Sequence, residues 1–465
     1  MRAKMNKIKE IYKSFPPQFW LVIVFEFFER GSYYGMMSIL SVYMTDILGF
    51  SKEGVGLIKS VIQPLLYFLP ILAGSIADRL GYRRTLMVSF ALLGTGYFLT
   101  SQMTTYTAVF ISLVIMGFGA GTFKPLISGT IAKLTNEKNS TFGFGIFYWS
   151  INFGAFLFPL ILVPILKGID WKLVIIASAL GTGLMIIPTY FFYKEPNNRN
   201  QVQGTILESI KDIFAKIFQV ATNWRFILFI FIYSWFWILY FQMFDSVLWY
   251  VKTFVDASEL DNFVNSILPI NWKFDVEHIT VINALTIIIL QLFVSKFVER
   301  FKAFPTIIAG LSFATIGMAT LSISHSVWVL LVGIIIFSFG EMVAHPKYIS
   351  YLGTIAPEDK KATYMGFGFL YGVFGSAIGG VFGAWLYVRL IDNPMINFIK
   401  SQLPQVDSNL SINELINYAT INGIDKTTIL AQAHTNQFWL IFAGIGILAI
   451  ISLILYQKFI GSSKH

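Results

Sequence analysis

The 465-residue sequence has no cysteine and few charged residues. The lack of cysteine excludes disulfide bonds, thiolate zinc sites, iron–sulfur clusters and a cysteine nucleophile, and it gives no information on the redox compartment. Charged residues make up 13% of the chain, about half of the roughly 25% that is usual in soluble proteins. This shortage excludes an ordinary soluble enzyme, a disordered protein and a nucleic-acid-binding protein.

Motifs for ATP-driven transport and for metal catalysis are also missing. No stretch fits the GxxxxGK[ST] loop that holds nucleotide phosphates, so the chain is not a self-contained ATP-driven pump. The histidines are too widely spaced for HExxH-type zinc ligation. Three glycines, Gly117, Gly119 and Gly121, lie within an apolar run and favour close helix packing over a dinucleotide loop. We therefore expect no enzyme activity, no metal site and no cofactor.

Long apolar segments dominate what the chain does contain. Hydrophobic residues make up 55% of it and aromatic residues 17%, and a helix that crosses a bilayer needs about 20 mostly apolar residues. Charge and turn clusters divide the sequence into twelve spans, near 18–48, 52–78, 85–103, 105–132, 141–166, 172–193, 224–253, 278–298, 303–324, 326–354, 362–390 and 436–458. The sequence therefore predicts an all-α, multi-pass integral membrane protein with twelve transmembrane helices, embedded in the lipid bilayer.

The distribution of positive charge predicts the orientation of these spans. With the N-terminus in the cytoplasm, about two thirds of the 34 Lys and Arg residues fall in cytoplasmic segments, as the positive-inside rule requires. We therefore expect both termini on the cytoplasmic side of the plasma (inner) membrane. Because topology accounts for the formal charge of +9, we expect no nucleic-acid partner.

A polar segment between the sixth and seventh spans divides the chain into halves. We expect an N-terminal six-helix bundle over 1–194, a cytoplasmic linker over 195–223 and a C-terminal six-helix bundle over 224–465. Within the linker, Thr205 and Glu208 fit a capping box, and the apolar spacing that follows is typical of an amphipathic helix on the membrane surface. A plain helical linker fits this segment equally well.

The C-terminal half includes an external insertion over 391–435, between the last two spans. Ser411 and Glu414 fit a second capping box, and Gly423 is a suitable helix stop. We expect one or two short helices that pack over the outer face.

The first span carries charged and phenolic residues on one face. At about 100° per residue they form a stripe about 140° wide, made of Glu26, Glu29, Arg30, Tyr33 and Tyr34. A charged residue in a span costs roughly 2.5–3.5 kcal/mol on the insertion scale and usually faces a cavity. Two carboxylates beside one guanidinium leave one that needs a further cation or a proton, so we interpret the stripe as a proton-titrating, ligand-contacting face. A permanent structural salt bridge is the alternative interpretation.

Further ionisable residues lie in later spans. Lys124 in span four can supply the missing cation, and protonation of a carboxylate paired with it would break the bridge. In span ten, Glu341 and His345 share one face, and His345 either titrates or donates one hydrogen bond. Lys347 points away from that face and is interpreted as a snorkelling residue. For Asp245 in span seven, a functional and a structural role remain equally open.

Several stretches resemble motifs of the proton-coupled oligopeptide transporters of the major facilitator superfamily. EFFERGSYYG (Glu26–Gly35) is similar to the family signature ExxERFxYY, and FYWSINFGAF (Phe147–Phe156) is similar to the FYxxINxG motif. GSIADRLGYRRT (Gly74–Thr85) resembles the loop motif between spans two and three, which indicates only the superfamily. GEMVAHP and APEDKKATYMGFGFL resemble the family's region of spans ten and eleven.

This resemblance implies two six-helix halves, alternating access and uptake driven by inward proton flow. It implies that proton coupling depends on Glu26, Glu29, Arg30 and Lys124. It also implies that a peptide ligand contacts Tyr33, Tyr34, Asn152, Asn283 and Glu341, with Glu341 holding its amino group. A zwitterionic peptide needs a cationic and an anionic partner, and Lys124 and Glu341 lie in opposite halves of the sequence.

Departures from the family pattern fall among the ligand contacts. Met37 stands where the family usually has an arginine that helps to bind the peptide carboxylate. Phe241 replaces an acid that often precedes Gln242, His345 replaces a serine, and Gly368 replaces a tryptophan. We include Met37, Gln242 and His345 among the expected ligand contacts. Proton coupling is expected to be intact, with altered ligand recognition.

These observations favour a proton-coupled symporter that imports di- or tripeptides or related amino-acid-derived compounds, with protons as the coupled ion. A proton-driven exporter of hydrophobic or cationic compounds is the alternative on the same fold, which the missing arginine favours and the ExxER cluster opposes. A non-transporting membrane receptor or scaffold is a further alternative, but such a protein has no need to tolerate buried charges.

Overall fold

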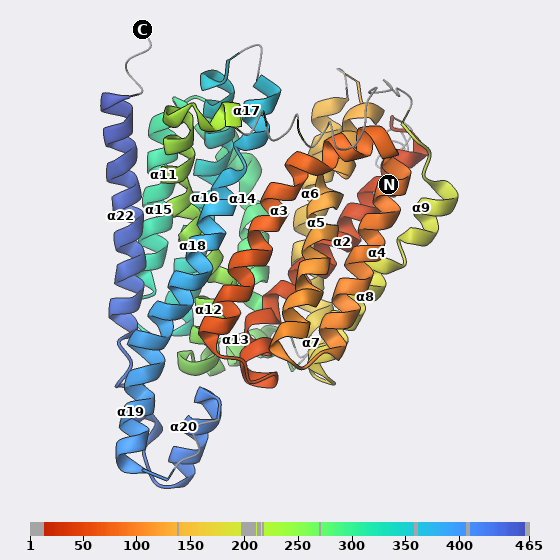
Figure 1. Ribbon diagram of the computed structural model, residues 1–465. Helices are drawn as coiled ribbons and strands as arrows, with labels where there is room; N and C mark the ends of the chain where they lie inside the picture. The colour runs from red at the N-terminus through yellow and green to blue at the C-terminus, as the bar shows by residue number, and fades with distance from the viewer. Residues whose placement is uncertain are drawn as a thin grey trace. The chain divides into compact units, whose positions relative to one another are not determined.

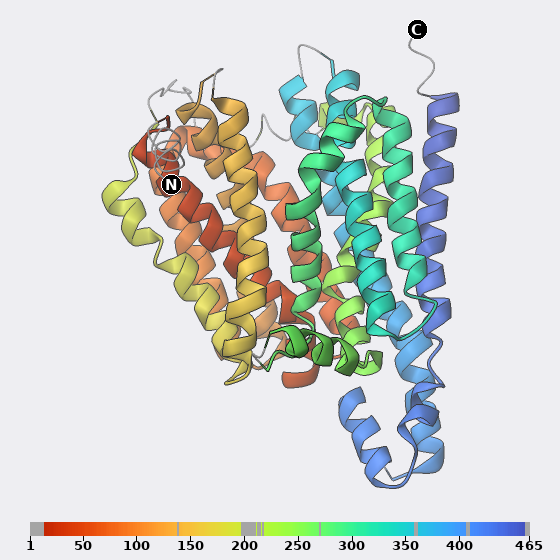
Figure 2. The same cartoon turned by 180° about the vertical axis from the view of Figure 1, so that it is seen from behind.

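The computed structural model describes residues 14–136, 139–196, 211, 215, 218–268, 271–357, 361–405 and 410–460. This described part is built from helices, and it has no strand beyond an isolated bridge between Asp256 and Ser326 (Figures 1 and 2). Apolar chain folds into helices in a bilayer because a helix satisfies its own backbone hydrogen bonds. The predicted all-α class is confirmed.

Among the described residues, ten helical segments are long and apolar enough to cross a membrane: Lys52–Gly74, Tyr106–Leu134, Phe142–Lys167, Trp171–Phe192, Trp224–Phe254, His278–Val298, Ala303–Thr320, Val327–Ile355, Thr363–Gln402 and Lys426–Phe459. They coincide with ten of the predicted spans. The two other predicted spans are also helical, in α2 (Pro17–Val42) and α4 (Tyr82–Gln102). The apolar character of α2 is interrupted by Glu26, Glu29 and Arg30.

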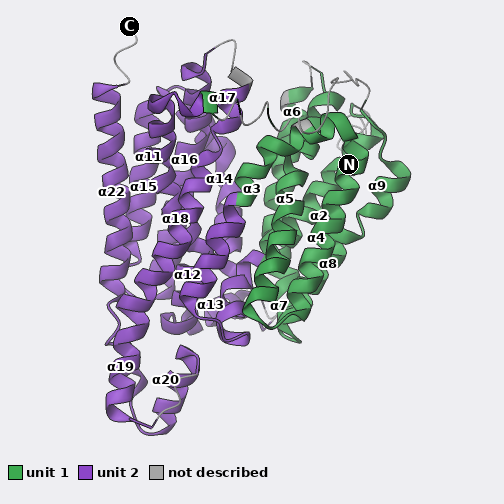
Figure 3. Ribbon diagram, viewed as in Figure 1, with its two compact units in different colours: residues 1–36, 65–219 green, residues 37–64, 220–465 purple. Residues whose placement is uncertain are grey.

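The chain groups into two compact units (Figure 3). Unit 1 holds residues 1–36 and 65–219, and unit 2 holds residues 37–64 and 220–465. The division therefore falls inside α2 and inside α3 (Lys52–Leu80). The bundles and the linker expected from the sequence stay predictions, and Thr205 and Glu208 lie outside the described residues.

Close helix packing builds unit 1. Besides parts of α2 and α3, it contains α4, α5 (Tyr106–Leu134), α6 (Ser140–Leu157), η2 (Phe158–Leu162), α7 (Val163–Lys167), α8 (Trp171–Gly183) and α9 (Ile186–Phe192). A Cβ atom added to Gly119 of α5 would lie 2.8 Å from the backbone nitrogen of Leu93, and one added to Gly121 would lie 2.7 Å from Leu69 Cβ. The packing role predicted for these glycines is confirmed, because no larger residue fits there without a shift.

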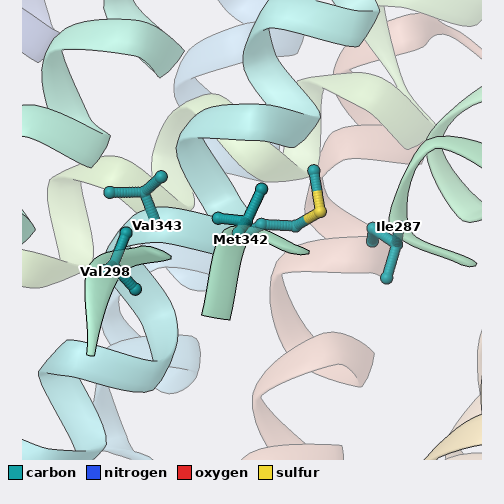
Figure 4. Close-up of a cluster of buried hydrophobic side chains, with 5 residues drawn as sticks. Ile287, Val298, Met342 and Val343 are labelled. Carbon is teal, nitrogen blue, oxygen red and sulfur yellow. The ribbon is translucent and has the colours of Figure 1, made fainter. Parts of the chain in front are cut away.

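Unit 2 holds the longer part of the chain. Its helices are α11 (Trp224–Phe241), η3 (Gln242–Phe244), α12 (Ser246–Phe254), α13 (Ser258–Ile267), α14 (His278–Val298), α15 (Ala303–Thr320), α16 (Val327–Ile355), α17 (Lys361–Phe367), α18 (Leu370–Tyr387) and η5 (Val388–Asp392), then α19 to α22. The facing glycines Gly310 and Gly340 bring α15 and α16 together. Between α14 and α16 lies a buried hydrophobic cluster that includes Ile287, Val298 and Met342 (Figure 4).

The external insertion differs from its prediction. The helix of α18 continues through η5 into α19 (Asn393–Gln402), so it does not end at 390. Among its described residues the insertion then forms two separate short helices, α20 (Ile412–Ile421) and α21 (Lys426–Leu430), before α22 (Thr435–Phe459), within the expected one or two. The capping box is confirmed, since Ser411 and Glu414 exchange backbone and side-chain hydrogen bonds. Gly423 has a φ of +91°, a conformation that ends helices and favours glycine.

Candidate functional site

The first group of functional residues lies on α2 in unit 1. Arg30 donates to the Glu29 carboxylate from Nε and, at 2.6 Å, from Nη2. Glu26 is one helical turn away, and its Oε1 lies 3.8 Å from Arg30 Nε. Its other oxygen, Oε2, is buried without a hydrogen-bond partner among the described residues. Arg30 therefore hydrogen-bonds to Glu29 and makes only a longer ion pair with Glu26, whose second oxygen has no hydrogen-bond partner in the described structure.

Aromatic rings surround the cations of this group. The guanidinium carbon of Arg30 lies 4.8 Å from the centre of the Tyr33 ring, and Tyr34 meets Tyr33 edge to face at 5.3 Å. On α5, Lys124 Nζ lies 5.0 Å from the ring centre of Tyr67. Such contacts stabilise a cation by roughly 0.5–2 kcal/mol.

Lys124 does not form the ion pair that the sequence suggests. Glu26, Glu29 and Arg30 are its electrostatic neighbours, yet within the described part of the chain only Arg30 pairs with these carboxylates. Arg30 lies next to Glu29 and one helical turn after Glu26, so both carboxylates have a guanidinium neighbour on their own helix. Asn152 of α6 donates to Tyr148 O at 2.9 Å, a bond within its own helix, so its role as a ligand contact stays a prediction.

The second group lies on α14 and α16 in unit 2. Asn283 Nδ2 donates to Glu341 Oε2 at 3.3 Å and to Ser338 Oγ at 2.8 Å. The structure thus brings together two residues that the family resemblance assigns to the ligand. Among the described residues no cation forms an ion pair with Glu341. Glu341 is therefore a carboxyl group in a membrane helix whose side-chain hydrogen-bond partner in the described structure is Asn283.

His345, one turn after Glu341, lies in an aromatic cluster. Its ring centre is 5.5 Å from those of Trp237 and Tyr371, which stack on each other at 4.4 Å. Tyr233 OH is 3.5 Å from His345 Nδ1, at the limit of a hydrogen bond. These partners come from α11 and α18, so the histidine of α16 packs against two other helices.

Two other predicted contacts, Gln242 and Met37, are buried within unit 2. Gln242 Nε2 donates to Ile238 O at 3.0 Å and to Gly379 O at 3.1 Å, while its Oε1 accepts from Ser246 at 2.7 Å. Both amide hydrogens are therefore used, one within the α11–η3 segment and the other in a bond to α18. Met37 is 3% exposed, and its sulfur lies 3.8 Å from Gln63 Nε2. Neither residue contacts Glu341 through a hydrogen bond.

Two buried ion pairs of unit 2 were not identified from the sequence. Lys59 of α3 pairs with Asp245, at the break between α11 and α12. Lys52, at the start of α3, lies 2.8 Å from Asp392 Oδ2 and 4.3 Å from the ring centre of Tyr387. The available signal was the spacing of Lys52 and Lys59, which lie seven residues apart and hence on one helix face.

The comparisons with known proteins agree with this architecture. Residues 20–271 and 257–392 match the family model of the Major Facilitator Superfamily. A di-/tripeptide transporter of Lactococcus lactis subsp. lactis is 30% identical over 187 residues, which cover 38% of this chain and 38% of that protein. The matched stretch therefore spans well under half the length of this relative.

Two solved structures resemble the whole fold. Peptide transporter POT in complex with sulfate has a TM-score of 0.71 and 19% identity, over 95% of this chain and 94% of that chain. A variant of the nucleoside transporter NupG has a TM-score of 0.68 and 16% identity, over 94% and 99%. The predicted twelve-helix fold and the resemblance to the oligopeptide transporters are confirmed, whereas likeness at this level of identity fixes the fold and not the ligand.

Proposed function

We propose that this chain, which belongs to the Major Facilitator Superfamily, is a proton-coupled symporter that imports di- or tripeptides or related amino-acid-derived compounds by alternating access. It is a multi-pass membrane transporter and not an enzyme. The observation that carries the proposal is the α2 group, in which Arg30 is taken by Glu29 and the neighbouring Glu26 keeps a buried oxygen without a partner.

The unpartnered oxygen of Glu26 supports a role in proton binding. A buried carboxylate with no compensating hydrogen bond is costly in its charged form and is neutralised instead by a proton or a cation. Lys124 is the nearest candidate cation on another helix, since Glu26 and Glu29 are among its electrostatic neighbours. In the proposed cycle, Glu26 exchanges a proton for an ion pair, and Glu29 keeps Arg30 in place throughout.

The ligand class follows from the second group and from the names of the relatives. Glu341, oriented by Asn283, accepts the ammonium group of a peptide, and Lys124 is assigned its carboxylate. Tyr33, Tyr34 and Asn152 stay assigned to the ligand through the family motifs, and His345 stays assigned to it at a position where the family has a serine. Because Met37 replaces the arginine of the family pattern, we expect weak selection for a free carboxylate. The positive-inside count supports a plasma-membrane location with cytoplasmic termini.

Uptake by purified protein in proteoliposomes tests the proposal. Labelled dialanine is expected to accumulate only under an inward proton gradient, and a protonophore is expected to abolish the accumulation. A nucleoside serves as the matched control substrate, because a nucleoside transporter shares the fold. Proton-driven accumulation of the nucleoside without any transport of dialanine or tripeptides would show that the ligand class is wrong.

A further inference from the structure

A groove of about 320 Å³ lies on unit 2 where the C-terminal end of α14 meets α15 and α16. Its walls include Phe297 and Phe301 at the end of α14, Ala309 and Phe313 of α15, and Phe339 and Val343 of α16. Val298 and Val343, which also line it, belong to the buried hydrophobic cluster (Figure 4). The volume lies at the lower end of the roughly 300–1,000 Å³ of small-molecule sites.

The lining of the groove is suited to an apolar occupant and not to water. Thr306 is the only lining residue with a side-chain hydroxyl, and this hydroxyl donates to Lys302 O at 2.8 Å. A stable buried water needs two to four polar partners, which the groove does not offer. Farther along α14, Leu292 and Phe293 are 80% and 74% exposed. In a membrane these side chains contact lipid, so the groove opens toward acyl chains.

Cationic residues stand at one end of this groove, which the proposed orientation of the chain places on the cytoplasmic side. The guanidinium carbon of Arg300 lies 4.6 Å from the ring centre of Phe297 and 5.8 Å from that of Phe301. Its Nε donates to Phe297 O at 3.0 Å, which holds the guanidinium above two rings of the groove wall. Lys302 is exposed in the same turn, where Glu299 is the one acid.

The turn that carries these cations is fixed to α16. Lys347 Nζ donates to Glu299 O at 3.2 Å and to Phe301 O at 2.8 Å. These bonds agree with the predicted location of Lys347 at the end of its span. They also show that Lys347 connects α16 to the turn after α14. Because the Lys347 ammonium group binds the carbonyl oxygens on either side of Arg300, it fixes the backbone of the turn and holds Arg300 beside the groove.

We propose that the groove binds an anionic phospholipid of the cytoplasmic leaflet, with an acyl chain against the phenylalanines and its headgroup phosphate at Arg300 and Lys302. Arginine suits phosphate because its planar guanidinium donates two parallel hydrogen bonds. The net positive charge of the mouth favours an anionic headgroup over a zwitterionic one. This inference depends on the proposed orientation of the chain and not on its transported ligand.

Native mass spectrometry of the full-length protein in detergent tests the proposal, with phosphatidylglycerol and phosphatidylcholine added at equal concentration. The wild type is expected to retain phosphatidylglycerol preferentially. Arg300→Gln is expected to lower its affinity about fivefold, the factor that corresponds to roughly 1 kcal/mol for a cation at the membrane surface. Ala309→Phe, which fills the groove, is expected to lower it at least as much. Because Arg300 is exposed, Arg300→Gln leaves the fold intact even if the groove-filling variant does not fold.

Two matched controls separate this site from general lipid adsorption. Arg225 is another exposed arginine beside an aromatic ring, 5.8 Å from Trp224, and Arg225→Gln is expected to bind phosphatidylglycerol as the wild type does. A second apolar groove, of about 400 Å³, lies between α15 and α22. Ala319→Phe, which fills this second groove, is expected to leave the affinity for phosphatidylglycerol unchanged. Equal retention of both lipids by the wild type, or equal losses in the control variants, would overturn the proposal.

Discussion

Lys59 of α3 and Asp245, at the break between α11 and α12, form a buried ion pair whose ammonium group is fully hydrogen-bonded. Besides the Asp245 carboxylate, Lys59 Nζ donates to Ser41 Oγ at 2.8 Å and to Phe244 O at 2.7 Å. Three acceptors satisfy the three hydrogens of an ammonium group. The pair thus ties α2, α3 and the α11–α12 break together within unit 2.

Removal of one partner of this pair is expected to cost much more than removal of both. Lys59→Met leaves the Asp245 carboxylate buried without a cation, which typically lowers the free energy of unfolding by about 3–5 kcal/mol. Lys59→Met combined with Asp245→Leu should recover most of that loss, because no uncompensated charge remains. Thermal unfolding of the purified single and double variants in detergent measures these losses of stability. Ser41→Ala, which is expected to lower the free energy of unfolding by about 1 kcal/mol, is the control. Additive losses in the double variant would show that the two residues act independently.

This ion pair also shows where prediction from sequence ends. Helical periodicity orders residues within one helix, so the face shared by Glu26, Glu29 and Arg30 was predictable. Asp245 and Lys59 are 186 residues apart, and periodicity gives the face of each without its partner.

The transmembrane spans were predictable because each is a long run of apolar residues. The places where the α-helix is interrupted within a span were not predictable. Span seven is interrupted by η3 at Gln242–Phe244, and no proline or glycine marks the place. Gln242 was expected to contact the ligand because the family pattern often has an acid directly before this glutamine, where Phe241 stands here. In the structure one of its amide hydrogens bonds to Gly379 O of α18, a contact that depends on how two distant helices pack.

The two glutamates of α2 are expected to respond differently to neutralisation. Glu29→Gln breaks the buried pair with Arg30 and should lower the free energy of unfolding by about 3–5 kcal/mol. Glu26→Gln removes a carboxylate whose Oε2 has no partner in the described structure, so stability should be nearly unchanged while proton-driven uptake is lost and counterflow exchange persists. Uptake and thermal unfolding measured on the same preparations test this. If Glu26→Gln retained full gradient-driven uptake, the proton would have to bind elsewhere.

A pH-dependent contribution to stability is expected from His325, in the turn before α16. Its Nε2 lies 2.9 Å from Thr435 Oγ1 and its ring contacts Phe254, and burial lowers the pKa of this imidazole below its usual 6.5. The unfolded chain therefore takes up a proton at a higher pH than the folded chain, so the contribution is complete above about pH 6.5 and is lost as the pH falls. His325→Asn should flatten the dependence of the melting temperature on pH below 6.5, whereas the exposed His434→Asn should not. An unchanged pH profile in His325→Asn would contradict the assignment.

The last prediction separates a ligand contact from a structural residue in unit 2. Glu341 has a carboxylate oriented by Asn283 and no cation paired with it in the described structure, whereas both amide hydrogens of Gln242 are used within the protein. A charge-assisted hydrogen bond contributes roughly 1.5–3 kcal/mol, so Glu341→Ala should weaken binding of dialanine about ten- to a hundredfold and binding of N-acetyl-dialanine little. Gln242→Ala leaves Ser246 and two helix contacts without their partner, and should lower the free energy of unfolding by about 1–3 kcal/mol while preserving the ratio of the two affinities. Calorimetric titration of both ligands against each variant gives the ratio. A Glu341→Ala variant that loses affinity for both ligands equally would assign Glu341 a structural role, and a changed ratio in Gln242→Ala would return Gln242 to the ligand site.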